Sequence, residues 1–129
     1  MQLDEILHAA DALGASDIHL VSGHIPMVRV DTVMQGMDLP MLSAACVEAF
    51  ARDITSDIQQ DRFAAEKDLD LSYAVEGLGR FRVNIHHQRT GMAMAMRSIR
   101  ETVPPLESLN LPQIVQKFAL LPRGLVLVT

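Results

Sequence analysis

Arginines occupy the positions of this 129-residue chain that are best suited to chemistry. Five of them fall between positions 77 and 100, a stretch that contains no Asp or Glu: Arg80, Arg82, Arg89, Arg97 and Arg100. The chain as a whole carries a net charge of −5. An arginine side chain offers a planar fork of N–H donors that fits phosphate oxygens. The pattern indicates either a local anion site or a basic surface that pairs with acidic segments elsewhere.

A hairpin in this stretch would bring two arginines face to face. If residues 80–99 form two strands with a tight turn at Arg89 and Thr90, opposed residue numbers sum to 179, and Arg82 lies directly opposite Arg97. The alternate side chains then form an apolar face. Opposed like charges destabilise a strand pair by roughly 0.2–1 kcal/mol. We therefore expect this pair to have an anionic partner.

Two kinds of partner fit the opposed arginines. One is a phosphate group, because small alanines on the same face leave room for a ligand, and Arg80, Asn84 and Arg100 are candidates for supporting contacts. The other is a carboxylate of the chain itself, such as Asp68 or Asp70. The residues alone leave both interpretations open.

The elements that must position this hairpin follow from hydrophobic periodicity. Apolar residues at helical spacing predict helices over 3–13, 42–54 and 56–63. Alternating patterns predict strands over 16–21, 27–30, 32–39, 69–75, 80–87 and 92–99. We expect an α+β fold with a mainly antiparallel sheet and helices on the face formed by Phe81, Val83 and Ile85.

The last quarter of the chain has a different pattern. Pro104 and Pro105 end the predicted sheet region, and residues 106–121 favour short helical pieces. Residues 125–128 form a continuous apolar run, typical of a strand buried on both faces of a parallel sheet. The chain supplies no neighbours for such a strand, so we expect a second, α/β domain to begin near Pro122. The alternative is that the run joins the first sheet.

Composition narrows the classes of function. The acidic net charge argues against nucleic-acid binding. A single cysteine forbids an internal disulfide, and neither a membrane-spanning run nor an export signal is visible. The histidines, among them His24, His86 and His87, lack companions at metal-ligand spacing, so no metal site is expected. We also expect no catalytic residue in this chain.

Four sequence boxes together resemble the type IV pilus retraction ATPases of the PilT and PilU type, within the type II and type IV secretion ATPases. They are ASDIHL at 15–20, PMVRVD at 26–31, GRFRVN at 79–84 and PRGLVLVT at 122–129, in the order and spacing of that family. The resemblance covers essentially the whole chain. Two departures stand out, because Thr32 replaces the usual Gly after the Asp, and His86-His87 replaces a small or aromatic pair.

The resemblance implies a domain plan and a site. It implies a PAS-like amino-terminal domain over 1–103, a helical linker over 104–121, and at 122–129 the first strand of a truncated RecA-like ATPase domain. It also implies that Arg82 and Arg97 contact nucleotide phosphates when the two domains close. This chain alone would be inactive, because it lacks the phosphate loop and metal-binding carboxylates that phosphoryl transfer requires.

The same resemblance implies a setting for the parent protein. It would be a hexameric twitching-motility motor that hydrolyses ATP with Mg²⁺ at the cytoplasmic face of the inner membrane. Its partners would be its own RecA-like domain, neighbouring subunits of the homohexamer and the pilus platform protein. The alternative function is a stand-alone PAS-like sensor of a small ligand, or an interaction domain. A sensor would need a roomy internal pocket, whereas a motor domain would have a filled core and a functional outer sheet face.

Overall fold

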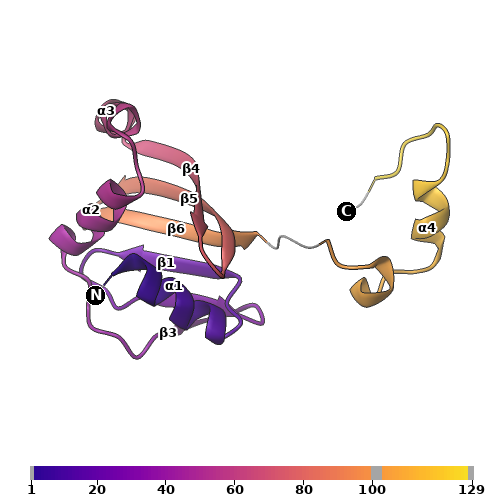
Figure 1. Cartoon of the computed structure of the whole chain (residues 1–129), viewed down its shortest axis with the longest axis horizontal. Coiled ribbons are helices and arrows are strands. Elements are labelled where there is room, and N and C mark those ends of the chain that lie inside the picture. The colour runs from indigo at the N-terminus through magenta and orange to yellow at the C-terminus, as the bar shows by residue number, and fades with distance from the viewer. Residues whose placement is uncertain (1, 100–102, 128–129) are drawn as a thin grey trace.

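A six-stranded antiparallel sheet forms the frame of the molecule (Figure 1). The computed structural model describes residues 2–99 and 103–127. The sheet has the order β3-β2-β1-β6-β5-β4. Its strands are β1 (Asp17–Val21), β2 (Met27–Val30), β3 (Val33–Gly36), β4 (Asp68–Val75), β5 (Gly79–Gln88) and β6 (Gly91–Ile99). The helices that pack against it are α1 (Leu3–Ala12), α2 (Ala44–Asp53) and α3 (Asp57–Glu66).

The predicted α+β fold and its core face are both confirmed. On β5, Phe81, Val83 and Ile85 are buried, and they alternate with polar side chains on the other face of the strand. Their neighbours on β6 are the buried Met94 and Met96. Helices α1 and α2 add their own apolar stripes to this single core: Leu3, Ile6, Leu7 and Ala10, and then Val47, Phe50 and Ala51. The opposite face of the sheet therefore carries the polar residues.

Local chemistry sets the ends of the helices. The Ser43 hydroxyl accepts the Cys46 N–H at 3.2 Å where α2 begins. At the start of α3, Ser56 and Gln59 cap each other reciprocally, as the sequence spacing predicts. Gly14, with φ +71°, follows α1 in the left-handed region that ends many helices. These caps explain why the predicted helices at 3–13, 42–54 and 56–63 appear near their expected positions.

The turn between β2 and β3 is strained. Asp31 and Thr32 have φ values of +46° and +72°, the signature of a two-residue type I′ hairpin turn. Thr32 is β-branched, and such residues rarely adopt positive φ. A hydrogen bond of 3.1 Å from Nη1 of Arg29 to the Thr32 carbonyl oxygen supports the turn. The departure from Gly at this position therefore costs backbone strain without changing the direction of the hairpin.

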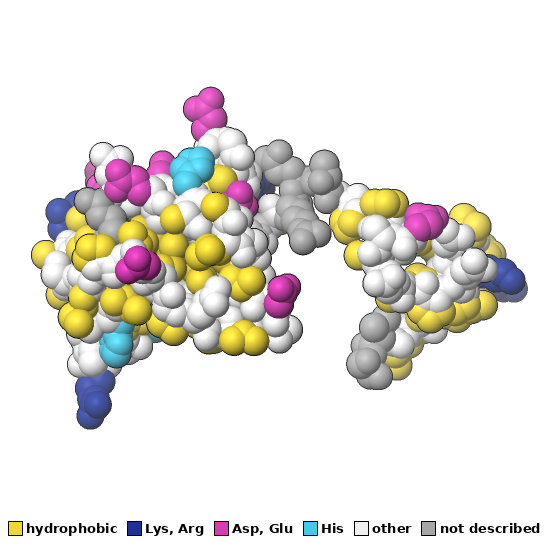
Figure 2. Space-filling model, turned by 90° about the horizontal axis from the view of Figure 1, so that it is seen from below, with side chains coloured by type: hydrophobic (Ala, Val, Ile, Leu, Met, Phe, Trp, Pro, Cys, Tyr) yellow, Lys and Arg dark blue, Asp and Glu magenta, His cyan; other side chains and the backbone are white. Residues whose placement is uncertain are grey.

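The described carboxy-terminal residues, 103–127, take no part in the buried core. All residues of that core lie between Leu3 and Met96. Residues 103–127 contain a short 3-10 helix, η1 (Leu106–Leu109), and α4 (Ile114–Ala119). Figure 2 shows apolar side chains at the surface of this segment, on the right of the view. The most exposed apolar residues there are Val103, Leu120, Leu121, Leu125 and Leu127.

The strand predicted over 125–128 is not formed in its described part, 125–127. Leu125 and Leu127 are 81% and 77% exposed. None of the described strands pairs with them, so their backbone N–H and C=O groups form no inter-strand hydrogen bonds with the sheet. Residues 128 and 129 lie outside the described part of the chain.

Replacing Thr32 with Gly should stabilise the protein. Glycine adopts the φ of +72° without a Cβ clash, and it retains the carbonyl that Arg29 binds. We expect a gain of about 1 kcal/mol in the free energy of unfolding, measured by urea denaturation. The Thr32→Ala variant, which keeps most of the strain, should gain less. A loss of stability in Thr32→Gly would show that the turn is not strained.

Deleting residues 125–129 should leave the sheet domain folded. The described part of the deleted segment, 125–127, contributes no side chain to the core cluster, so the free energy of unfolding should change by no more than about 0.5 kcal/mol. Circular dichroism during thermal unfolding measures this. If the deletion unfolds the domain, the apolar run belongs to the first sheet and the predicted boundary is wrong.

Candidate anion-binding face of the sheet

The arginine hairpin forms in the predicted register. Arg82 lies opposite Arg97 and Asn84 opposite Ala95, with the turn at Arg89 and Thr90. The alternate side chains of this hairpin enter the core. The two arginines therefore project from the face of the sheet that α1, α2 and α3 leave uncovered.

A row of charged residues crosses this face at the level of the two arginines. The strand registers place Arg29 on β2 beside Asp17 on β1, Asp17 beside Arg97 on β6, and Arg97 beside Arg82 on β5. The charges along the row are positive, negative, positive and positive. Each neighbouring pair is a direct cross-strand pair, the arrangement in which side chains interact most strongly.

Asp17 is the anchor of this row. Its side chain is only 13% exposed, and its Oδ1 accepts a 2.8 Å hydrogen bond from Nε of Arg97. Its Oδ2 accepts a 2.8 Å bond from the Ser16 hydroxyl and lies 3.4 Å from Nε of Arg29. Burial acts to raise the pKa of this carboxyl, but the hydrogen bonds from Arg97 and Ser16 and the nearby guanidinium charges outweigh it. The net result is a lowered pKa, so Asp17 is ionised at neutral pH.

Asp70 holds the other arginine much more loosely. Its Oδ2 lies 3.6 Å from Nη2 of Arg82, and both side chains are more than half exposed. Asp68, the second predicted carboxylate partner, pairs differently: it accepts a 2.7 Å hydrogen bond from Nδ2 of Asn84. The interpretation in which carboxylates neutralise the arginines thus holds for Asp70 and not for Asp68. The partner of Arg97 is Asp17, which was not among the carboxylates named from the sequence.

The charged row borders a shallow depression of about 350 Å³. In the next row, Ala95 lies between His19 and Asn84, and its small side chain leaves this space open. The residues that line the depression are Asp17, His19, Asp70, Arg82, Asn84, Ala95, Met96 and Arg97. It offers two guanidinium groups and one amide to a ligand, beside two carboxylates of the chain.

The predicted supporting residues differ in their placement. Asn84 lines the depression, and its Oδ1 lies 2.9 Å from Nδ1 of His86. Arg80 is exposed on the same strand but does not line the depression. Arg100 lies outside the described residues. Sequence reasoning missed Asp17 and His19; the alternation of residues 16–21 already placed both on the polar side of their strand.

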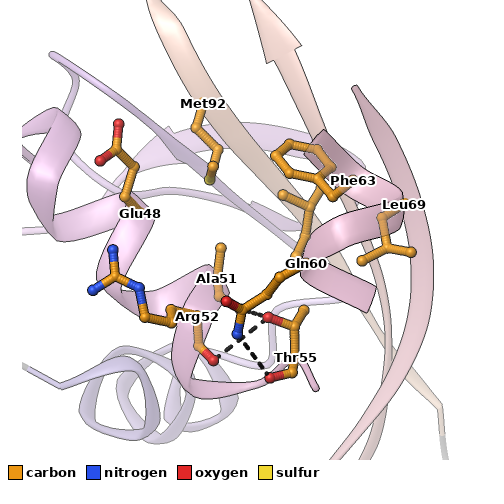
Figure 3. A pocket seen from close by; sticks show the side chains of 9 residues that line it. Glu48, Ala51, Arg52, Thr55, Gln60, Phe63, Leu69 and Met92 are labelled. Atoms are coloured by element: carbon orange, nitrogen blue, oxygen red, sulfur yellow. Dashed lines mark hydrogen bonds between the residues drawn. The ribbon is translucent and has the colours of Figure 1, made fainter. Parts of the chain in front are cut away.

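A second hollow, of about 220 Å³, lies between α2, α3 and the covered face of the sheet (Figure 3). Phe63, Leu69 and Met92 are among the apolar residues that line it, and Glu48 and Arg52 add charged side chains. Two of its polar side chains bind backbone carbonyl groups of the same lining. The Thr55 hydroxyl donates to the Ala51 carbonyl at 2.7 Å, and Nε2 of Gln60 donates to the Thr55 carbonyl at 3.2 Å.

Two features are absent from the part of the chain that the structure describes. None of the helices there is long and apolar enough to cross a membrane. Nor do those residues hold three or more His, Cys, Asp or Glu side chains in a group that could bind a metal ion.

Comparison with solved structures defines the class of protein. The ATPase DotB of Legionella pneumophila aligns with a TM-score of 0.72 and 24% identity, over 89% of this chain and 33% of that one. At this level of identity the likeness concerns the fold alone. The pilus retraction motor PilT, solved with bound ADP, aligns with a TM-score of 0.79 and 34% identity, over 91% of this chain and 34% of that one.

Curated relatives narrow the class further, although no family model matches the chain. The type IV pilus retraction ATPase PilT of Pseudomonas aeruginosa is 38% identical over 129 residues, which is all of this chain and 38% of that protein. A twitching motility protein of Neisseria gonorrhoeae is 38% identical over 104 residues, or 81% of this chain and 28% of that protein. This chain is a homologue of the amino-terminal region of the type IV pilus retraction ATPase family. It spans little more than a third of the length of the Pseudomonas aeruginosa protein.

Acid should remove the stabilisation that Asp17 provides. Its pKa in the folded protein is below the unfolded value, so its contribution is complete above about pH 4 and is lost as pH falls through the folded pKa. We expect Asp17→Asn to cost about 2 kcal/mol at pH 7, the scale of hydrogen bonds to charged groups. The difference from the wild type should shrink below pH 4, as measured by urea denaturation between pH 7 and pH 3.

Asp68→Asn is the matched control for this experiment. It removes a carboxylate from the same face, but one that binds an amide and not an arginine. Its stability difference from the wild type at pH 7 should be small. A constant Asp17→Asn difference between pH 7 and pH 3 would contradict the assignment of Asp17 as the ionised anchor.

Proposed function

We propose that this chain is the regulatory, nucleotide-contacting amino-terminal domain of a type IV pilus motor ATPase. In this proposal Arg82 and Arg97 bind nucleotide phosphates. The observation that carries it is the pair of arginines in direct cross-strand register on the uncovered sheet face, with side chains that are 70% and 71% exposed. Like charges in direct register are unfavourable unless an anion compensates them.

The geometry of the pair suits a polyphosphate. Arg97 uses Nε for Asp17, and within the described residues its terminal nitrogens have no hydrogen bond or ion pair. These nitrogens form one edge of the guanidinium fork, which binds phosphate oxygens in pairs. The two arginines come from neighbouring strands and line the same depression, so one ligand there can contact both. Their chemical role is to neutralise negative charge on the phosphates, which favours a transition state in which that charge is redistributed.

The wider setting rests on the similarity to retraction ATPases. We propose that the parent motor is a ring hexamer that hydrolyses ATP with Mg²⁺ at the cytoplasmic face of the inner membrane. The phosphate-binding loop and the metal ligands would belong to a RecA-like domain, and the arginines of this domain would approach it on closure. The platform protein of the pilus would receive the mechanical work. The domain boundaries are also part of this proposal: the amino-terminal domain would end at residue 103, and the linker to the RecA-like domain would end at residue 121.

Small-ligand sensing is the second candidate, because a hollow does exist beneath α2 and α3 (Figure 3). At about 220 Å³ it is smaller than typical ligand pockets, which measure roughly 300–1,000 Å³. Its Thr55 and Gln60 groups already bind within the chain. On the arginine face, by contrast, Arg82 makes only a long ion pair with Asp70, and Arg97 uses only its Nε in binding Asp17. This contrast favours the phosphate-contacting function.

Replacing either Arg82 or Arg97 with Ala in the full-length motor should lower ATP turnover at least about tenfold, which corresponds to about 1.4 kcal/mol of barrier. A coupled assay of phosphate release measures this. In the chain described here, Arg82→Ala should leave thermal stability nearly unchanged, because its ion pair is long and exposed. Arg97→Ala should lower stability, because it leaves Asp17 short of a partner.

Arg89 is the internal control for these variants. It is an exposed arginine of the same hairpin, located at the turn, and Arg89→Ala removes the same charge without touching the depression. Its turnover should match the wild type. Normal turnover in both Arg82→Ala and Arg97→Ala would refute the phosphate-contact role.

A further inference from the structure

The two arginines are bound by carboxylates of very different character. The Asp17 side chain is almost buried, and its carboxylate contacts Arg97, Ser16 and Arg29. Its shortest arginine contact is 2.8 Å. Asp70 is 57% exposed and makes a single contact of 3.6 Å with Arg82. A ligand that approaches the depression therefore meets one tightly bound arginine and one loosely bound arginine.

Asp17 cannot easily give up Arg97. Removing that arginine would leave a poorly solvated carboxylate with one partner fewer, a costly arrangement in a protein. The bond also runs through Nε, which is not part of the terminal edge of the fork. Arg97 can therefore keep Asp17 and still present both Nη groups to a ligand. Ser16 and Arg29 hold the Oδ2 atom of the same carboxylate, and this fixes its orientation.

Asp70 competes directly with a ligand for Arg82. Its contact uses Nη2, one of the two nitrogens that a phosphate would need. The pair is long and exposed, and such pairs contribute little free energy. A polyphosphate with several negative charges can therefore replace Asp70 at little cost. Asp68 offers no such competition, because it binds Asn84.

We propose, on the basis of the phosphate site described above, that the two carboxylates act on it in opposite directions. Asp17 is a positioning residue that holds Arg97 ready for a polyphosphate. Asp70 is a displaceable internal counterion that occupies Arg82 until the polyphosphate arrives. The site is thus half preorganised and half blocked when no ligand is bound.

The test is a titration of this chain with inorganic triphosphate at low ionic strength, followed by NMR of the arginine Nε–H groups. The variants are Asp17→Asn, Asp70→Asn and the charge-matched control Asp68→Asn. All three remove one negative charge from the same face, so differences among them report position and not net charge. We expect Asp70→Asn to bind triphosphate about threefold tighter than Asp68→Asn, the scale of a weak exposed ion pair. We expect Asp17→Asn to bind about fivefold weaker than Asp68→Asn, because Arg97 loses a charged hydrogen bond that orients it.

Ser16→Ala provides a second variant in case Asp17→Asn folds poorly. It removes one hydrogen bond to Asp17 and changes no charge. We expect about twofold weaker triphosphate binding, together with a shifted Arg97 Nε–H resonance and unchanged core methyl resonances. A merely structural role for Asp17 would alter stability without this change in affinity.

The outcomes separate this proposal from the one on which it rests. If Asp17→Asn, Asp70→Asn and Asp68→Asn bind triphosphate equally while the arginines remain essential, the opposed roles of the carboxylates are wrong. If Ser16→Ala binds as tightly as the wild type, Asp17 is not a positioning residue. If the double variant Arg82→Ala/Arg97→Ala binds as well as the wild type, the phosphate site itself is wrong.

Discussion

The pairing of β1 with β6 joins the two halves of the sheet, and both the core and the charged face depend on it. Strands β1 to β3 form one meander and β4 to β6 another, and this ladder alone connects them in the strand order. On the covered side it places Ile18 beside Met96 and Leu20 beside Met94, all of them buried. On the open side the same register sets Asp17 beside Arg97. A shift of one residue would exchange these two sets of side chains.

This ladder also explains how the domain tolerates two arginines in direct register. Repulsion between Arg82 and Arg97 is offset on one flank by Asp17 and on the other by Asp70. The compensation is unequal because Asp17 lies near the middle of the sheet, where neighbouring strands shield it from water. Asp70 lies on the edge strand β4, where solvent screens its charge. The position of a strand in the sheet therefore decides how firmly its carboxylate holds an arginine.

The sequence was most informative where neighbours in space are neighbours in the chain. The register of β5 and β6 followed from one turn and from alternation, and the cap of α3 followed from Ser56 and Gln59. Asp17 and Arg97 are separated by 80 residues, and no local pattern marks the strands that carry them as partners. For that reason the sequence pointed to Asp68 and Asp70, which lie closer to the hairpin along the chain, and the partner of Arg97 was missed. Residues 125–127 form no strand for a related reason: a strand requires another strand beside it, and none of the described strands pairs with them.

The rigid ladder between β5 and β6 has a geometric consequence. Arg82 and Arg97 occupy directly opposed positions of a continuous antiparallel ladder, so nothing short of separating the strands changes the spacing of their Cα atoms. A ligand gripped by one arginine leaves the domain free to pivot about that contact. A ligand gripped by both removes most of that freedom, because two fixed points restrict a rigid body to rotation about the line between them. A ligand bound by one arginine thus only attaches the domain, whereas a ligand bound by both arginines also sets its orientation.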